Sequence, residues 1–146
     1  MDPEPETTSA DSTLHIPPRV LLAEDCESAR LAMELCLRHI GCEPHSAQNG
    51  RQAVEMFASG GFGMVFMDLE MPGMDGREAT ARIRDMEQEY GLPPVPVIAL
   101  TAHDDPASRE MCRNAGFTGY MVKPATIDGI RRVLTQCGQL PADASP

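Results

Sequence analysis

The stretch MVFMDLEMPGMDG, residues 64–76, decides the fold. Its first four residues form an apolar run without alternation, and the fifth is the carboxylate Asp68. Similar apolar runs lie at residues 20–23, 97–100 and 120–122. Short continuous runs of this kind are typical of strands buried on both faces, as in parallel sheets covered by helices. A weaker fifth strand is predicted at residues 43–47, where Pro44 favours an edge position.

The segments between these runs have helical patterns. In the first, the apolar residues share one side of a helix that Gly41 would end; they are Ala29, Ala32, Met33, Cys36, Leu37 and Ile40. The other predicted helices run from an N-cap at Asn49 to Gly60, around residues 79–86, over 106–115 and over 127–137. Five β-then-α units predict a doubly wound, mostly parallel α/β sheet with helices on both faces.

Composition limits the classes of function. The chain has 146 residues, of which 42 % are apolar, and a formal net charge of −10. The only basic cluster is Arg131-Arg132, so the chain lacks the basic face that direct binding of nucleic acid needs. No apolar run is long enough to span a membrane. Five cysteines without C-x-x-C spacing indicate neither a disulfide framework nor a zinc site.

The ends of the chain differ from its middle. Residues 1–18 are rich in Pro, Ser, Thr and acids, and they predict a flexible tail. This start does not resemble a signal peptide, so the free thiols indicate the reducing cytoplasm. One domain is predicted over residues 19–137, followed by a flexible C-terminal tail at 138–146.

Reactive side chains follow four of the apolar runs. They are Glu24-Asp25, Asp68, Thr101 and Lys123. In a doubly wound sheet, the carboxyl ends of the strands form one crevice, so these side chains are predicted to meet. Three carboxylates repel one another, and oxygen-only ligands favour a hard ion such as Mg²⁺. A carboxylate beside a cation and an ammonium group can attack a phosphoryl group.

Each of these residues also has an ordinary structural interpretation. Asp25, Asp68 or Thr101 could cap a helix, and Tyr120 could be a core aromatic. Lys123 is the only lysine among twelve Lys and Arg residues. Because Arg and Lys are not interchangeable, this supports a specific need for an amine at this position. The combination at the strand ends is therefore more specific than any single residue.

At this point the chain resembles the receiver domain of two-component response regulators. The motifs that carry the resemblance are Glu24-Asp25, MDLEMPGMDG at 67–76, Thr101-Ala102 and YMVKP at 120–124. The resemblance covers residues 19–137 and implies a flavodoxin-like, three-layer sandwich with strand order 2-1-3-4-5.

The resemblance also implies a phosphorylation site. Asp68 would accept a phosphoryl group from a phosphohistidine, and Thr101 and Lys123 would bind that group. Mg²⁺, or Mn²⁺ in its place, would be held by four ligands: Glu24, Asp25, Asp68 and the backbone carbonyl of Glu70. The Lys123-Pro124 peptide bond would be cis.

A conformational switch and its partners are implied as well. Thr101 would move toward the phosphoryl group and Tyr120 would turn inward, changing the face made by the fourth helix, fifth strand and fifth helix. The partners would be a histidine kinase or histidine phosphotransfer protein, and a downstream protein at that face. Homodimer formation is left open. Glu70 and His103 would flank the site and tune dephosphorylation, with a plain rim position as the alternative for His103.

Periodicity adds one further candidate surface. Leu31 and Leu35 lie on the side of the first helix opposite its core stripe. They are either scattered surface leucines or a docking patch for a helix of the phosphodonor protein.

Three other functions share part of this pattern of residues. A haloacid-dehalogenase-like phosphatase would need D-x-D-x-T/V, and Asp68-Leu69-Glu70-Met71-Pro72 lacks the second Asp. A flavin-binding module would need a phosphate-cradling loop in place of the acidic Glu24-Asp25-Cys26-Glu27. An inactive receiver would serve only as an interaction module.

The chain could be a stand-alone regulator or part of a hybrid histidine kinase.

Overall fold

The structure is a computed structural model, and it describes residues 16–141. The predicted tails at 1–18 and 138–146 lie mostly outside this range, in residues 1–15 and 142–146. Within the described part, Gln139 Nε2 donates to the carbonyl of Gly63 at 3.2 Å, and Leu140 packs against the core. None of the helices in residues 16–141 has the length and apolar character needed to cross a bilayer.

Five strands and five helices alternate along the described residues. The strands are β1 (Arg19–Ala23), β2 (Glu43–Ala47), β3 (Met64–Asp68), β4 (Val97–Thr101) and β5 (Gly119–Val122). The helices are α2 (Glu27–Ile40), α3 (Gly50–Ala58), α4 (Gly76–Glu89), α5 (Pro106–Asn114) and α6 (Ile127–Gln136). All strand pairs are parallel and their order is β2-β1-β3-β4-β5, which confirms the predicted fold.

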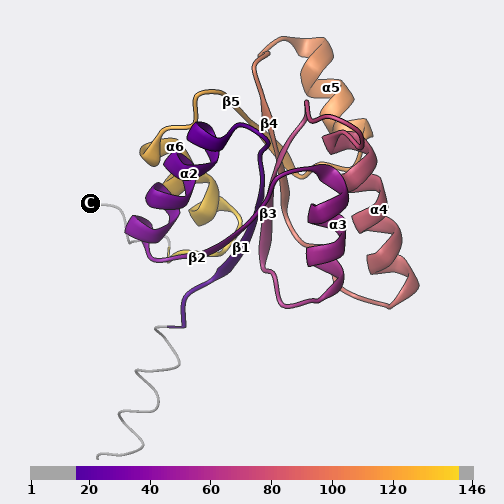
Figure 1. The fold of residues 1–146 in the computed structure, drawn as a ribbon, viewed down its shortest axis with the longest axis horizontal. Helices are drawn as coiled ribbons and strands as arrows, with labels where there is room; N and C mark the ends of the chain where they lie inside the picture. The colour runs from indigo at the N-terminus through magenta and orange to yellow at the C-terminus, as the bar shows by residue number, and fades with distance from the viewer. Residues whose placement is uncertain (1–15, 142–146) are drawn as a thin grey trace, which may run out of the picture.

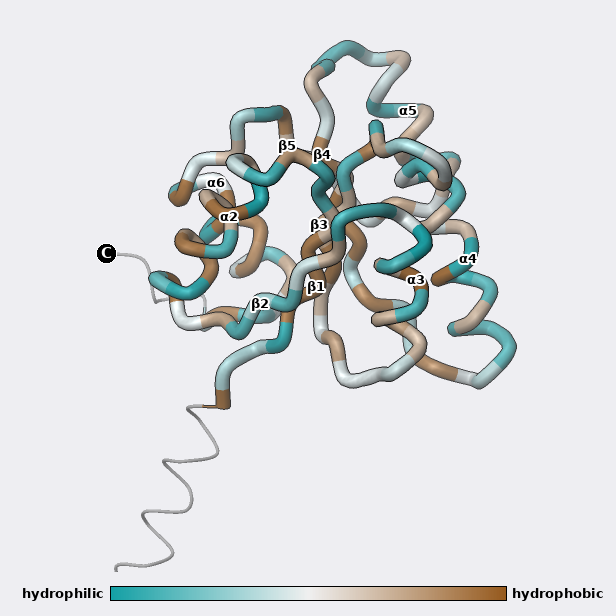
Figure 2. The backbone as a smooth tube through the Cα atoms, in the orientation of Figure 1, coloured by the Kyte–Doolittle hydropathy of each residue, from teal (hydrophilic) through white to brown (hydrophobic). Residues whose placement is uncertain are grey.

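Helices cover both faces of the sheet. Figure 1 shows α2 and α6 on one side and α3, α4 and α5 on the other. Alternate residues of each central strand enter two separate cores, so that Val65 and Met67 face α3 and α4 while Met64 and Phe66 face α2 and α6. The central strands accordingly carry the brown of hydrophobic residues in Figure 2. Burial on both faces explains why these strands lack polar alternation.

The helices begin at side-chain caps, with one exception. The Asn49 side chain accepts from Gln52 N–H as predicted, and Asp75, Asp105 and Thr126 cap α4, α5 and α6 in the same way. α2 begins at Cys26 without a side-chain cap and ends at Gly41, whose φ of 115° suits glycine.

One part of the predicted core stripe is wrong. Met33 and Leu37 are buried, but Ala32 is exposed. Ala32 instead lines a cavity of about 360 Å³ with Leu100 and Pro124. The cavity lies between the first turns of α2 and the β5–α6 loop, so the stripe is covered only along part of its length.

A buried ion pair ties α4 to the far end of the sheet. Arg84 Nη1 lies 2.9 Å from Glu87 Oε1, and Glu87 Oε2 accepts from the N–H of Val95 at 2.8 Å. Arg84 also donates to the carbonyl of Gly116 at 3.0 Å and to Thr118 Oγ1 at 3.3 Å. The pair therefore holds the segments that lead into β4 and β5 in place. β4 ends at Thr101, and β5 ends just before Lys123.

Candidate functional site

Three carboxylates meet at the carboxyl ends of β1 and β3. Glu24 and Asp25 follow β1, and Asp68 is the last residue of the neighbouring β3. One oxygen from each lies within 4.8 Å of the other two. Glu24 and Asp68 are each 2 % exposed, whereas Asp25 is exposed at the rim. The cluster is thus open to solvent on the side of Asp25.

The amine of Lys123 completes the charged centre. Its Nζ lies 3.0 Å from Asp68 Oδ1 and 3.4 Å from Glu24 Oε1. The Lys123 backbone N–H donates to the carbonyl of Thr101 at 2.7 Å, and the Lys123-Pro124 peptide bond is cis. Lys123 therefore neutralises part of the charge of two buried carboxylates.

The buried charges shift the pKa values of this centre. Burial, followed by a side-chain hydrogen bond with Asp68, raises the pKa of Glu24 above its usual range. Burial opposes the charge of Lys123, but the hydrogen bond and attraction to Asp68, together with Glu24, outweigh it and raise the pKa of the amine. Excess negative charge, incompletely balanced by one ammonium group, is the environment that a divalent cation stabilises.

The loop after β3 folds tightly over Asp68. Asp68 Oδ1 accepts from the N–H of Glu70 at 3.2 Å, and the N–H of Gly76 donates to the carbonyl of Leu69 at 3.0 Å. A Cβ atom on Gly76 would lie 2.2 Å from the carbonyl oxygen of Asp68, so only glycine fits there. Gly50 is equally confined, 2.4 Å from the carbonyl oxygen of Met74.

These two glycines shape the loop beside the site, and sequence analysis did not single them out. The signal for Gly76 was its place at the end of the MDLEMPGMDG segment. No local pattern marks Gly50, because its neighbour Met74 is 24 residues away in the chain.

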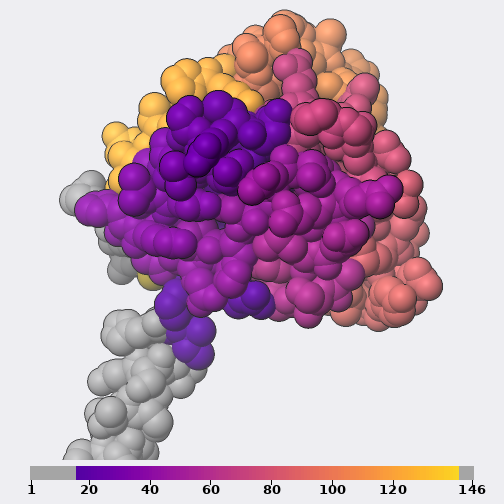
Figure 3. Space-filling view, viewed as in Figure 1, coloured from indigo at the N-terminus to yellow at the C-terminus, as the bar shows by residue number. Residues whose placement is uncertain are grey.

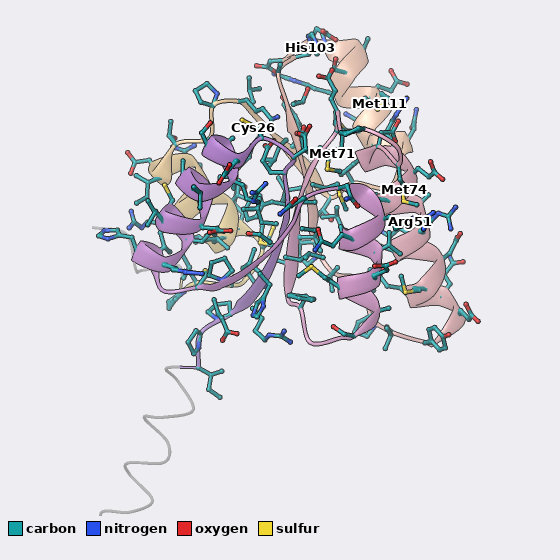
Figure 4. The ribbon with its side chains drawn as sticks, in the orientation of Figure 1. Cys26, Arg51, Met71, Met74, His103 and Met111 are labelled. Carbon is teal, nitrogen blue, oxygen red and sulfur yellow. The ribbon has the colours of Figure 1, made fainter. Side chains whose placement is uncertain are left out.

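The ordinary interpretation as helix caps does not hold for the site residues. Cys26 stands at the N-cap of α2, Asp75 at that of α4 and Asp105 at that of α5. Asp25, Asp68 and Thr101 have no such role. Figure 4 shows Cys26, Met71 and His103 on the loops that follow β1, β3 and β4, at one end of the molecule.

Thr101 and Tyr120 lie at the β4–β5 side of the site. Thr101 is 4 % exposed, and its Oγ1 accepts from the N–H of His103 at 3.0 Å. His103 is exposed, which fits its alternative as a rim residue. The half-buried Tyr120 packs against the core on the side of α3, α4 and α5, and it donates its hydroxyl to Asp104 Oδ1 at 2.8 Å.

The apolar residues on α2 are exposed. Leu31 is 48 % exposed and Leu35 is 70 % exposed, one turn apart. Figure 3 shows α2, β2 and α3 side by side on one face of the molecule, and α2 forms part of the outer surface there. The helix therefore presents two leucines to solvent, as the periodicity predicted.

Comparison with known proteins gives the family. The family model described as "Response regulator receiver domain" matches residues 20–135. The chain is 31 % identical over 121 residues to the peroxide stress-activated histidine kinase mak3 of Schizosaccharomyces pombe, which covers 81 % of this chain and 5 % of that kinase. It is 35 % identical over 121 residues to the sensor histidine kinase GacS of Pseudomonas protegens, covering 83 % and 13 %. The chain thus spans only a small part of these relatives.

Solved structures agree with this assignment. The receiver domain of the sensor histidine kinase PA1611 from Pseudomonas aeruginosa, solved with a coordinated magnesium ion, superposes with a TM-score of 0.75 at 32 % identity, covering 84 % of this chain and 98 % of that one. The Saccharomyces cerevisiae complex of Ypd1 with the receiver domain of Ssk1 gives a TM-score of 0.80 at 29 % identity, covering 84 % and 89 %. With the family model, the strand order and the acidic cluster in agreement, this chain belongs to the response regulator receiver domain family.

Proposed function

We propose that the chain is a phosphoacceptor in a two-component phosphorelay and that Asp68 takes the phosphoryl group. The observation that carries the proposal is the contact of Asp68 Oδ1 with Lys123 Nζ at 3.0 Å beside two further carboxylates. The family match favours this function over the phosphatase and the flavin-binding module that the sequence left open. A receiver domain is not an enzyme in the usual sense, since it modifies its own side chain.

A magnesium ion fits the donor set. The Glu24, Asp25 and Asp68 side chains and the carbonyl of Glu70 are the proposed ligands, and all are oxygen donors of the kind that Mg²⁺ or Mn²⁺ takes. When bound, the ion would supply positive charge to these carboxylates and to the oxygens of the incoming phosphoryl group. Exposure of Asp25 leaves room for water and phosphate oxygens at the rim.

The protein groups have separate roles in the transfer. A carboxylate oxygen of Asp68 attacks phosphorus, the bond from phosphorus to the donor histidine nitrogen breaks, and its electron pair leaves with that nitrogen. Lys123 then pairs with a phosphoryl oxygen in place of Asp68. Thr101 donates its hydroxyl to another phosphoryl oxygen once it turns away from His103.

The partners follow from the same proposal. A histidine kinase or histidine phosphotransfer protein donates the phosphoryl group and docks against Leu31 and Leu35, whose exposure leaves apolar area to cover. The downstream protein binds the α5–β5–α6 face, where Tyr120 changes position. The same chemistry serves a stand-alone regulator and the receiver part of a hybrid kinase.

Phosphorylation by acetyl phosphate tests the proposal. With Mg²⁺, intact-mass spectrometry is expected to show the gain of one phosphoryl group, and Asp68→Ala or chelation of the metal abolishes it. Asp85→Asn removes an exposed carboxylate of α4 outside the site and should react like the wild type. A phosphoryl group on Asp68→Ala, or none on the wild type, would reject Asp68 as the acceptor and favour an inactive interaction module.

The docking patch has its own test. Leu31→Ser with Leu35→Ser should slow transfer from a phosphorylated histidine phosphotransfer protein, while the reaction with acetyl phosphate is unchanged. Leu92→Ser is the control, because this leucine is 49 % exposed and lies in the α4–β4 connection, away from α2. Equal transfer rates in the double variant and the control would show that these leucines are scattered surface residues.

A further inference from the structure

The β4–α5 loop, residues 102–105, is held by a carboxylate with three donors. Arg109 of α5 donates to Asp104 Oδ1 through Nε at 3.0 Å and Nη2 at 2.7 Å. Tyr120 of β5 donates to the same oxygen through its hydroxyl at 2.8 Å. The Arg109 guanidinium also lies 5.4 Å from the centre of the Tyr120 ring. Asp104 therefore joins the loop to α5 and β5 at once.

The loop in turn holds the hydroxyl of Thr101. Thr101 Oγ1 accepts from the N–H of His103 at 3.0 Å, one residue before Asp104. The backbone of Thr101 is fixed separately, because its carbonyl accepts from the N–H of Lys123 at 2.7 Å. A turn of the Thr101 hydroxyl toward Asp68 consequently removes this bond between Thr101 and His103, and with it one contact that holds the loop in its present position.

We propose that Asp104, Arg109 and Tyr120 form a latch that keeps the β4–α5 loop, and with it Thr101, in the unphosphorylated arrangement. This proposal rests on the proposed function, since it concerns the conformational response to phosphorylation of Asp68. Asp104 and Arg109 are positioning residues: neither touches the phosphoryl site, and both act through Tyr120 and the loop. Figure 4 shows His103 at the outer end of this loop, and residues 102–105 are all exposed.

The exposure of the latch indicates its strength. The side chains of Arg109 and Asp104 are 50 % and 47 % exposed. The hydrogen bonds from Arg109 and Tyr120 lower the pKa of Asp104, so the carboxylate stays charged in ordinary buffers. Exposed ion pairs are individually weak, so the latch shifts an equilibrium and does not block it. Its loss should raise the population of the switched state about fivefold, which is the change in an equilibrium constant that corresponds to roughly one net hydrogen bond.

Tyrosine emission provides a direct measurement. The chain contains two tyrosines and no tryptophan, so in a Tyr90→Phe background the emission reports Tyr120 alone. The full chain with Mg²⁺ is titrated with beryllofluoride, which stands in for the phosphoryl group. In the Asp104→Ala and Arg109→Ala variants the half-saturating beryllofluoride concentration should fall about fivefold. Arg113→Ala, which removes an exposed arginine one turn further along α5, should leave it unchanged.

The two substitutions separate a latch from simple electrostatics. Removing a negative charge near the site would favour an anion, and removing a positive charge would disfavour it. Simple electrostatics therefore shifts Asp104→Ala and Arg109→Ala in opposite directions, whereas the latch shifts both the same way. Asp104→Asn, which keeps one acceptor, should give an intermediate shift and serves if the alanine variant folds poorly.

The outcomes are distinguishable. No response of the Tyr90→Phe protein to beryllofluoride would overturn the proposed function. A normal response with opposite shifts, or with shifts no larger than that of Arg113→Ala, would overturn the latch and leave the proposed function standing.

Discussion

The buried pair of Arg84 and Glu87 yields a prediction about how the sheet is held in register. We expect Glu87→Ala to destabilise the folded protein much more than Glu78→Ala. Both are Glu residues of α4 paired with Arg, but the Arg84–Glu87 side chains are 22 % and 5 % exposed, against 56 % and 53 % for Arg82–Glu78. The chain thus supplies its own matched control.

The magnitude follows from the groups left without partners. Glu87→Ala removes the acceptor of Val95 N–H and the carboxylate that neutralises Arg84, which stays partly buried by its bonds to Gly116 and Thr118. Breaking a buried pair costs about 3–5 kcal/mol, and the partial exposure of Arg84 places this case near 3 kcal/mol. Glu87→Gln keeps an acceptor for Val95 and should cost about 1.5 kcal/mol. Glu78→Ala should cost less than about 0.5 kcal/mol.

Urea denaturation followed by circular dichroism measures these differences. With a slope of about 2 kcal/mol per molar urea, Glu87→Ala should lower the midpoint by about 1.5 M. The order of the variants is Glu87→Ala, then Glu87→Gln, then Glu78→Ala and wild type together. If Glu87→Ala matched Glu78→Ala, burial would add nothing to this pair, and the anchoring of β4 and β5 would have to come from the apolar core.

Three further predictions concern the site. Mg²⁺ at ten times its dissociation constant should raise the free energy of unfolding by about 1.4 kcal/mol. Thermal melts should show a smaller gain for Asp25→Asn, and a gain equal to that of the wild type would argue against Asp25 as a ligand. Burial raises the pKa of Glu24, so the folded state without Mg²⁺ binds this proton more tightly than the unfolded state does. The resulting stabilisation is present at pH values below the usual Glu range and is lost as the pH rises through the raised pKa. Urea titrations should show the free energy of unfolding fall with pH in this way, and Glu24→Gln or saturating Mg²⁺ should remove the fall. Gly76→Ala should cost about 1–3 kcal/mol, since its Cβ would meet the Asp68 carbonyl at 2.2 Å. Gly129→Ala, whose Cβ meets only side-chain atoms at 3.1 Å and 3.2 Å, should cost less than about 1 kcal/mol, and similar costs for both would refute the steric argument.

The sequence by itself determined the sheet and the identity of the charged centre. Apolar runs such as 64–67 can be buried on both faces only between two helical layers, and a right-handed β–α–β order brings their carboxyl ends to one edge. The convergence of Asp68 and Lys123, 55 residues apart, therefore follows from pattern and topology alone.

Only the tertiary structure decided the contacts that depend on loop conformation. Nothing local indicates that Ala32 lines an open cavity, that Arg84 reaches Thr118, or that Asp104 joins Arg109 to Tyr120. Hydrophobic periodicity reports which side of an element is buried, because burial repeats with the period of the element. Single polar contacts have no period, and their partners are fixed only once the packed layers set the path of each loop.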